Sequence, residues 1–120
     1  MSEKIIAGTI MLTMLDGTKK FLVNKCQNEQ HLVSAIAQLE RTGLASILER
    51  LKEEVNLDVT HLELLELTNG VIKGQSVPLF VFEAVEKNVP LDLPHEYVWE
   101  DFKHFQQIVQ KFNIEGMPSF

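Results

Sequence analysis

The sequence has few of the features that cross-link a chain or anchor it in a membrane. Its one cysteine, Cys26, has no second cysteine with which to form an internal disulfide. There is no apolar segment of the signal-peptide kind near the N-terminus, and no uninterrupted apolar run of about 18 residues. These absences predict a cytoplasmic protein that does not span a membrane.

Positive charge is also scarce. Eleven basic residues stand against 17 acidic ones, which gives a formal net charge of -6. This balance argues against a polyanionic partner such as duplex DNA or an acidic membrane surface. The 120 residues, of which 45% are hydrophobic, suit a single core, and we expect one domain over residues 1–120.

The N-terminal third predicts a β-hairpin. The apolar run KIIAGTIMLTML is followed by Asp16-Gly17, a strong turn signal, and then by KKFLV. The next stretch, residues 27–41, has no clear periodicity. It leaves two alternatives open, an irregular loop or a short helix around residues 30–40.

A helix over residues 43–55 is the clearest prediction in the chain. Its apolar residues recur at the spacing that builds one stripe on a helix: Leu44, Ile47, Leu48, Leu51 and Val55. Thr42 is expected to cap the N-terminus through its hydroxyl, and Asn56 to end the helix in the left-handed conformation.

The second half alternates strand and helix signals. Asn69-Gly70 predicts a turn, and VPLFVFEAV predicts a buried strand that begins near Pro78. A C-terminal helix over about 98–112 follows from apolar residues on one helical side: Val98, Phe102, Phe105, Ile108, Val109 and Phe112. Strands and helices sharing one core predict an α/β sandwich.

The polar side of helix 43–55 is the candidate functional surface. Glu49, Arg50, Glu53 and Glu54 project away from the apolar stripe, and Arg50 and Glu54 are spaced as an ion pair. Carboxylates at this density either hold a metal ion or form the solvated face of an ordinary helix. Composition alone favours the solvated face.

The order of these residues resembles a known family. The run LKEEVNL, residues 51–57, resembles the end of the Nudix (MutT-like) box, R-E-U-x-E-E-x-G-U with U aliphatic, and Asn56 stands where the pattern has glycine. Three other stretches look like parts of the family's fold: AGTIMLTMLDGTKKFLVNK like its first hairpin, PLFVFEAV like its central strand, and YVWEDFKHFQQIV like its closing helix. The resemblance implies an α/β/α sandwich with a mixed sheet.

The resemblance also implies a metal-dependent hydrolase. This chain, however, departs from the residues of the box at several positions. Ala35 falls on the first glycine of the box and Arg41 on its first glutamate, while Glu49-Arg50 reverses the expected Arg-Glu order. In the family, glutamates of this region hold the Mg²⁺ or Mn²⁺ that bridges a diphosphate and activates water. Here a guanidinium that does not lose its proton, Arg50, replaces one ligand. A swapped ion pair between Arg41 and Glu49 is a further hypothesis.

Two functions follow from the resemblance. We favour a Nudix-fold protein with a degraded metal site, non-catalytic or weakly active, in which Arg50 and Arg41 bind a nucleotide-like anion or a protein partner. We expect Mg²⁺ or Mn²⁺ as a cofactor if it is active, and none otherwise. The alternative is a divergent diphosphate hydrolase acting on nucleoside diphosphates linked to X. It would use Mg²⁺ or Mn²⁺, with Glu53 and Glu54 as catalytic metal ligands and Glu49 as a third.

Other candidate features are weaker. The resemblance suggests a homodimer, for which the apolar run HLVSAIA is a candidate surface. Tyr97 and Trp99 are either core residues or a corner that stacks on a ligand base. The histidines have no close metal-ligand spacing among themselves and receive no role: His31, His61, His95 and His104.

Overall fold

The first hairpin forms where the sequence predicts it. Strands β1 (Lys4–Thr13) and β2 (Lys19–Cys26) pair antiparallel, with Met11 opposite Phe21. Gly17 in the connecting turn has a φ of 89°, a conformation that glycine adopts without a steric penalty. The Asp16-Gly17 turn is therefore confirmed.

The structure, a computed structural model, describes residues 4–26, 29–37, 42–72, 75–90, 92–94 and 96–111. After the hairpin come β3 (Glu29–His31), β4 (Val33–Ala37), α1 (Gly43–Glu53), β5 (Glu63–Ile72), β6 (Gln75–Val85), β7 (Tyr97–Asp101) and α2 (Phe102–Lys111), with short 3₁₀ turns at Val59–His61 and Glu86–Asn88. Neither described helix has the length and apolar character needed to cross a membrane.

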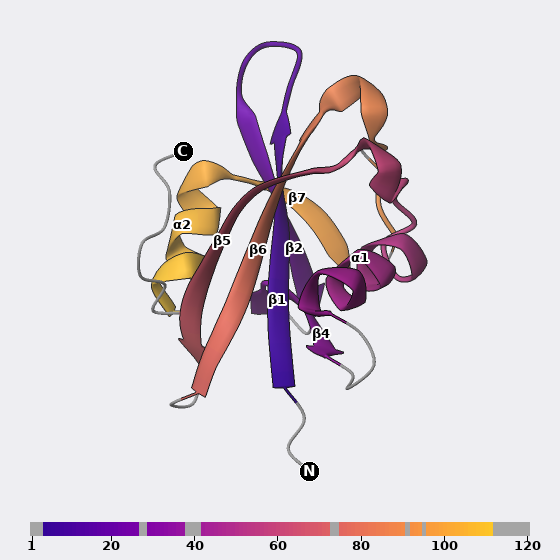
Figure 1. The fold of residues 1–120 in the computed structure, drawn as a ribbon. Coiled ribbons are helices and arrows are strands. Elements are labelled where there is room, and N and C mark those ends of the chain that lie inside the picture. The colour runs from indigo at the N-terminus through magenta and orange to yellow at the C-terminus, as the bar shows by residue number, and fades with distance from the viewer. Residues whose placement is uncertain are drawn as a thin grey trace.

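The seven described strands form one mixed sheet. The order is β3-β2-β1-β6-β5, while β4 also pairs with β1 and β7 with β2. β1 and β6 run parallel, and the other pairs are antiparallel. Helices α1 and α2 cover opposite faces of this sheet (Figure 1). The predicted α/β/α sandwich with a mixed sheet is confirmed.

Each face of the sheet has its own apolar core, because neighbouring residues of a strand point to opposite faces. The core under α1 includes Ile47 and Leu51 of the helix, and the core under α2 includes Phe105 and Ile108. Close contact between α1 and the sheet depends on Gly8 of β1: a Cβ atom there would lie 2.6 Å from Cγ1 of Ile47. Gly8 thus sets how near α1 approaches the sheet.

The segment without periodicity contains strands in its described part. Residues 29–37 form β3 and β4, which pair with β2 and β1 respectively, so neither predicted alternative, loop or helix, applies there. The apolar residues Leu32, Val33 and Ala35 are buried within the chain's own core. Ile36 of the run HLVSAIA is 47% exposed, and a homodimer through this stretch stays a prediction.

The prediction of a turn at Asn69-Gly70 is wrong. Both residues lie inside β5, where Asn69 pairs with Pro78 and Gly70 with Val77. The chain reverses later, between Ile72 and Gln75. Pairing with β6 over nine residue pairs outweighs the local turn preference of the dipeptide.

The C-terminal helix is shorter than predicted. Residues Tyr97–Asp101 form β7 against β2, and α2 begins at Phe102. Trp99 therefore lies on a strand and not on the closing helix. The predicted apolar side is right for Phe105 and Ile108, which are buried, while Phe112 lies outside the described residues.

Helix α1 begins at the predicted residue and ends two residues early. The Ala45 N–H donates to the Thr42 hydroxyl at 3.1 Å, and Asn56 has a φ of 60°. The last helical residue is Glu53, two residues before the predicted end, and Val55 is buried beyond it. The predicted cap and the left-handed end are confirmed.

Candidate functional site

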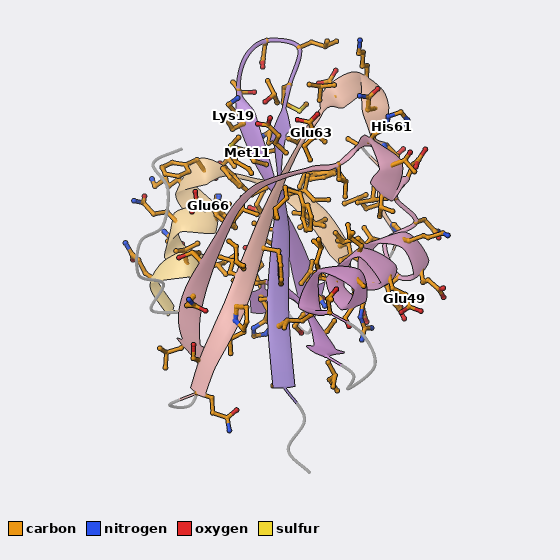
Figure 2. All side chains as sticks on the ribbon, in the orientation of Figure 1. Met11, Lys19, Glu49, His61, Glu63 and Glu66 are labelled. Carbon is orange, nitrogen blue, oxygen red and sulfur yellow. The ribbon has the colours of Figure 1, made fainter. Side chains whose placement is uncertain are left out.

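A pocket of about 350 Å³ lies between β4 and the polar side of α1. Its lining consists of Ala35, Ile36, Ser46, Glu49, Arg50, Glu53 and Glu54. Glu49 projects outward from α1 on this side (Figure 2). The structure thus brings the four charged residues predicted from the helix into one pocket, together with Ala35 of β4.

The helix geometry explains this gathering. Ile47 and Leu51 are fully buried against the sheet, so the residues on the opposite side of α1 face the solvent. Ser46 lies near the start of the helix, where its hydroxyl donates to the Thr42 carbonyl at 3.1 Å. β4 closes the pocket because its residues 33–37 pair with β1 beside α1.

The charges of the lining are unequal. Glu49, Glu53 and Glu54 contribute three negative charges and Arg50 one positive charge, which leaves a formal net charge of two negative units. The predicted ion pair is present, with Nη1 of Arg50 3.5 Å from Oε1 of Glu54. Both side chains are partly exposed, at 38% and 55%, so the pair is weak and easily opened.

These carboxylates do not form a ready metal centre. Among the described residues, the group of three whose ligand atoms lie within 4.8 Å of one another is a different one, and it excludes Glu49, Glu53 and Glu54. Three carboxylate oxygens around one hard cation must approach more closely than that. The residues as placed do not fit the divalent ion that the family resemblance implies, and their metal-ligand role stays a prediction. Arg41 lies outside the described residues.

Tyr97 does not line the pocket, but its hydroxyl is influenced by two residues that do. Burial raises the pKa of its hydroxyl, with Glu54 and Glu96 adding to the rise and the positive charge of Arg50 opposing it. The hydroxyl is therefore within electrostatic reach of two residues that line the pocket. The sequence offered a weak signal, since Tyr97 is the chain's one tyrosine.

Strain and an unsatisfied polar atom occur beside Tyr97. The preceding residue, Glu96, has a φ of 86°, which is unfavourable for a residue with a side chain. Asn24 lies opposite Tyr97 in the pairing of β2 with β7, and its Oδ1 atom is buried without a hydrogen-bond partner among the described residues. Features of this kind are enriched at functional sites.

Comparison with known proteins places this fold. No model of a known protein family matches the chain, and no curated protein sequence does. Solved structures do match over nearly the whole chain. An Ap4A hydrolase from C. elegans is 18% identical, covers 88% of this chain and 87% of its own, and has a TM-score of 0.58.

Two further structures have the same architecture. The Nudix hydrolase RenU from M. smegmatis is 12% identical, covers 92% of this chain and 88% of its own, and has a TM-score of 0.65. The NUDIX domain of Shewanella oneidensis NrtR, solved with ADP ribose, is 13% identical, covers 92% and 87%, and has a TM-score of 0.53. A mixed sheet between two helices, together with the similarity to these three structures, defines an α/β domain of the Nudix type. This chain has the Nudix fold.

Proposed function

We propose that this protein is a Nudix-fold binding protein, in which Arg50 holds the phosphate groups of a nucleotide-like ligand and hydrolysis is weak or absent. The observation that carries the proposal is the position of Arg50. It lines the pocket, and its side chain is 38% exposed and has a carboxylate no nearer than 3.5 Å in the pair with Glu54.

The chemistry of arginine supports this role. A guanidinium presents a planar fork of donors that matches two phosphate oxygens at once, and it stays charged at any ordinary pH. A phosphate that approaches Arg50 competes with one long, partly exposed ion pair, which contributes little. Tyr97 supplies a hydroxyl near the same charge.

The surrounding carboxylates limit the affinity. With a net charge of two negative units, the described lining repels an isolated anion. In the proposal, Arg41 contributes a second positive charge. The ligand gains the remaining affinity from apolar contacts with groups such as Ile36. We therefore expect binding in the micromolar range and strong weakening by salt.

The alternative function is a divergent hydrolase of nucleoside diphosphates linked to X, dependent on Mg²⁺ or Mn²⁺. The observation that favours it is the same negative lining, since Glu49, Glu53 and Glu54 share one pocket and attract a divalent cation. One of the similar structures is described as a hydrolase of Ap4A and another holds ADP ribose, which makes these two compounds suitable probes.

Two single substitutions, each of which removes one positive charge from α1, test the proposal. We expect the wild-type protein to bind ADP-ribose without added metal, as measured by titration calorimetry. Arg50→Ala should weaken this binding by about tenfold to a hundredfold, since it removes a charge-assisted contact. Lys52→Ala is the matched control, because Lys52 is an exposed cation on the same helix that does not line the pocket, and it should change binding by less than about twofold.

The double exchange Glu49→Arg with Arg50→Glu separates the two functions. It restores the Arg-Glu order of the box, so we expect metal-free ADP-ribose binding to fall and binding of Mn²⁺ to rise. Hydrolysis of Ap4A or ADP-ribose by the wild-type protein in Mg²⁺ would favour the alternative. Equal effects of Arg50→Ala and Lys52→Ala would sink the proposal.

A further inference from the structure

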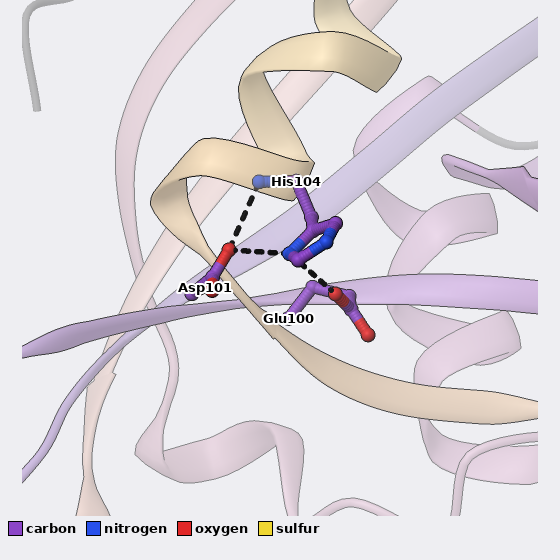
Figure 3. Close-up of side chains that lie close together, drawn as sticks. All are labelled: Glu100, Asp101 and His104. Carbon is purple, nitrogen blue, oxygen red and sulfur yellow. Dashed lines mark hydrogen bonds and ion pairs between the residues drawn. The ribbon is translucent and has the colours of Figure 1, made fainter.

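A second group of charged side chains lies where β7 passes into α2. Nδ1 of His104 is 2.8 Å from Oδ1 of Asp101 and 3.5 Å from Oε2 of Glu100 (Figure 3). One ligand atom from each residue lies within 4.8 Å of the other two. Among the described residues, this is the set of three potential metal ligands that converges in this way.

We propose that Glu100, Asp101 and His104 form a binding site for a divalent transition-metal ion of the Zn²⁺ type. This site is separate from the pocket and does not rest on the proposed function. Its residues come from β7 and α2, whereas the pocket is lined by β4 and α1, and α1 covers the opposite face of the sheet (Figure 1).

The spacing of the donor atoms suits such an ion. Two ligands bound at about 2.0–2.1 Å lie about 3.3 Å apart at the tetrahedral angle. The distances of 2.8 Å and 3.5 Å from Nδ1 of His104 to the two carboxylates lie on either side of this value. Small side-chain rotations therefore bring all three atoms into one coordination sphere.

The fold holds two of the three ligands in place before any ion arrives. Glu100 and Asp101 belong to β7, where they pair with Phe21 and Lys20 of β2. Oδ1 of Asp101 also accepts the His104 N–H at 2.9 Å, and this bond orients the carboxylate. A hydrogen bond that fixes the orientation of a metal ligand raises the affinity of that ligand for the metal.

Glu100 supplies an observation that points to a cation. Its side chain is only 21% exposed, yet among the described residues it has no lysine or arginine within ion-pair distance. Its partner is the His104 ring, which is neutral unless protonated. Lys20 acts on the neighbouring Asp101. Glu100 is a partly buried carboxylate next to a second carboxylate, Asp101. A bound cation would compensate this negative charge.

The donor set indicates which ions suit the site. One imidazole nitrogen with two carboxylate oxygens favours borderline ions such as Zn²⁺, whereas Mg²⁺ and Ca²⁺ prefer oxygen alone. His104 and Asp101 are about half exposed, so solvent reaches the remaining coordination positions. The sequence signal is the spacing of the two carboxylates, four and three residues before His104. A search for spacings among the histidines alone does not find it.

The test is a titration of the full-length protein with Zn²⁺ by calorimetry. We expect the wild type to bind one equivalent, and His104→Gln and Glu100→Gln each to weaken binding by about tenfold or more. Both replacements are at partly exposed positions and leave the Asp101 cap intact. Circular dichroism checks that each variant is folded, and either variant alone can decide the outcome.

Two controls make the result specific. His61→Gln is matched to His104→Gln, because His61 is 49% exposed and lies 3.4 Å from Asp58 with the same i, i+3 spacing, but no second carboxylate of the described residues converges on it. It should change zinc binding by less than about twofold. The pair Glu53→Gln with Glu54→Gln removes carboxylates of the pocket and should also leave zinc binding unchanged.

The proposal is overturned by any of three results. The wild type binds no Zn²⁺ at millimolar concentration, His61→Gln weakens binding as much as His104→Gln does, or the pocket variant abolishes it. Spectra of the ¹⁵N-labelled protein with a trace of Cu²⁺ give an independent measurement. We expect line broadening around residues 99–105, and broadening confined to the pocket contradicts the site.

Discussion

At the scale of single residues, Asn56 shows how one conformation limits the choice of side chain. Its φ of 60° lies in the left-handed region, which glycine enters freely and which asparagine tolerates better than other residues. The residue follows the end of α1, just after Glu53 and Glu54, and its neighbours Val55 and Leu57 are buried. Asn56 therefore ends α1 in a conformation that glycine would also adopt.

This conformation predicts opposite effects for two substitutions. Asn56→Gly should raise the free energy of unfolding by up to about 1 kcal/mol, and Asn56→Ala should lower it by about 1 kcal/mol. Urea denaturation followed by circular dichroism measures both. Asn69→Gly is the control, because Asn69 lies in the extended strand β5, where glycine should destabilise. The same sign at positions 56 and 69 would contradict the role assigned to the left-handed turn.

The residues of the pocket could be predicted only in part. Glu49, Arg50, Glu53 and Glu54 share one polar side of a helix, so local periodicity is enough to place them together. Tyr97 reaches the same region through the pairing of β7 with β2, and such a long-range contact leaves no local pattern. How close the carboxylates approach one another depends on side-chain rotamers, which spacing does not determine.

At the scale of elements, the N-terminus of α1 depends on a side-chain cap. Thr42 accepts the Ala45 N–H, and its carbonyl accepts both the N–H and the hydroxyl of Ser46. The first turn contains no acidic residue that could otherwise favour the exposed N–H groups. Thr42 therefore has a large share in holding the end of α1 that carries Ser46 into the pocket.

Loss of this cap should be measurable. We expect Thr42→Ala to lower the free energy of unfolding by about 1 kcal/mol, since one backbone N–H loses its acceptor. Thr42→Ser keeps the hydroxyl and should stay within a few tenths of that of the wild type. Thermal unfolding of the three proteins provides the comparison. Equal destabilisation by alanine and serine would show that the threonine methyl group, and not the cap, stabilises the helix.

Elements were predictable where local signals decide them. The first hairpin and α1 have a turn glycine, a cap and an apolar stripe within a few residues of one another. β3, β4 and β7 are short strands that exist because β1 and β2 offer unpaired backbone groups. In the same way, pairing with β6 extends β5 through Asn69-Gly70. A sheet partner far along the chain outweighs local preference at each of these places.

At the scale of the whole molecule, the two faces of the sheet carry separate cores. On the α2 side, the rings of Phe21 and Phe105 stack with centroids 4.2 Å apart, while Phe102 meets Phe21 at 5.9 Å and is 39% exposed. Phe105 is 1% exposed. Phe105 is thus the most deeply buried of the α2 side chains in this core, followed by Ile108.

Removal of this ring should destabilise the whole domain. We expect Phe105→Ala to lower the free energy of unfolding by about 3–5 kcal/mol, a large fraction of the total for a domain of this size. Phe102→Ala, at an exposed neighbour of the same chemistry, should lower it by about 1 kcal/mol. Urea denaturation of both variants gives the difference. Similar losses would mean that Phe105 is not the anchor of α2.

The parallel pairing of β1 with β6 has a consequence for how the chain is made. Residues Ala7–Thr13 are synthesised well before their partners Leu79–Val85, which follow much later along the chain. Until then one edge of the central strand has no neighbour and exposes apolar side chains on both faces. Completion of the sheet therefore waits for the second half of the chain, and such distant contacts slow folding.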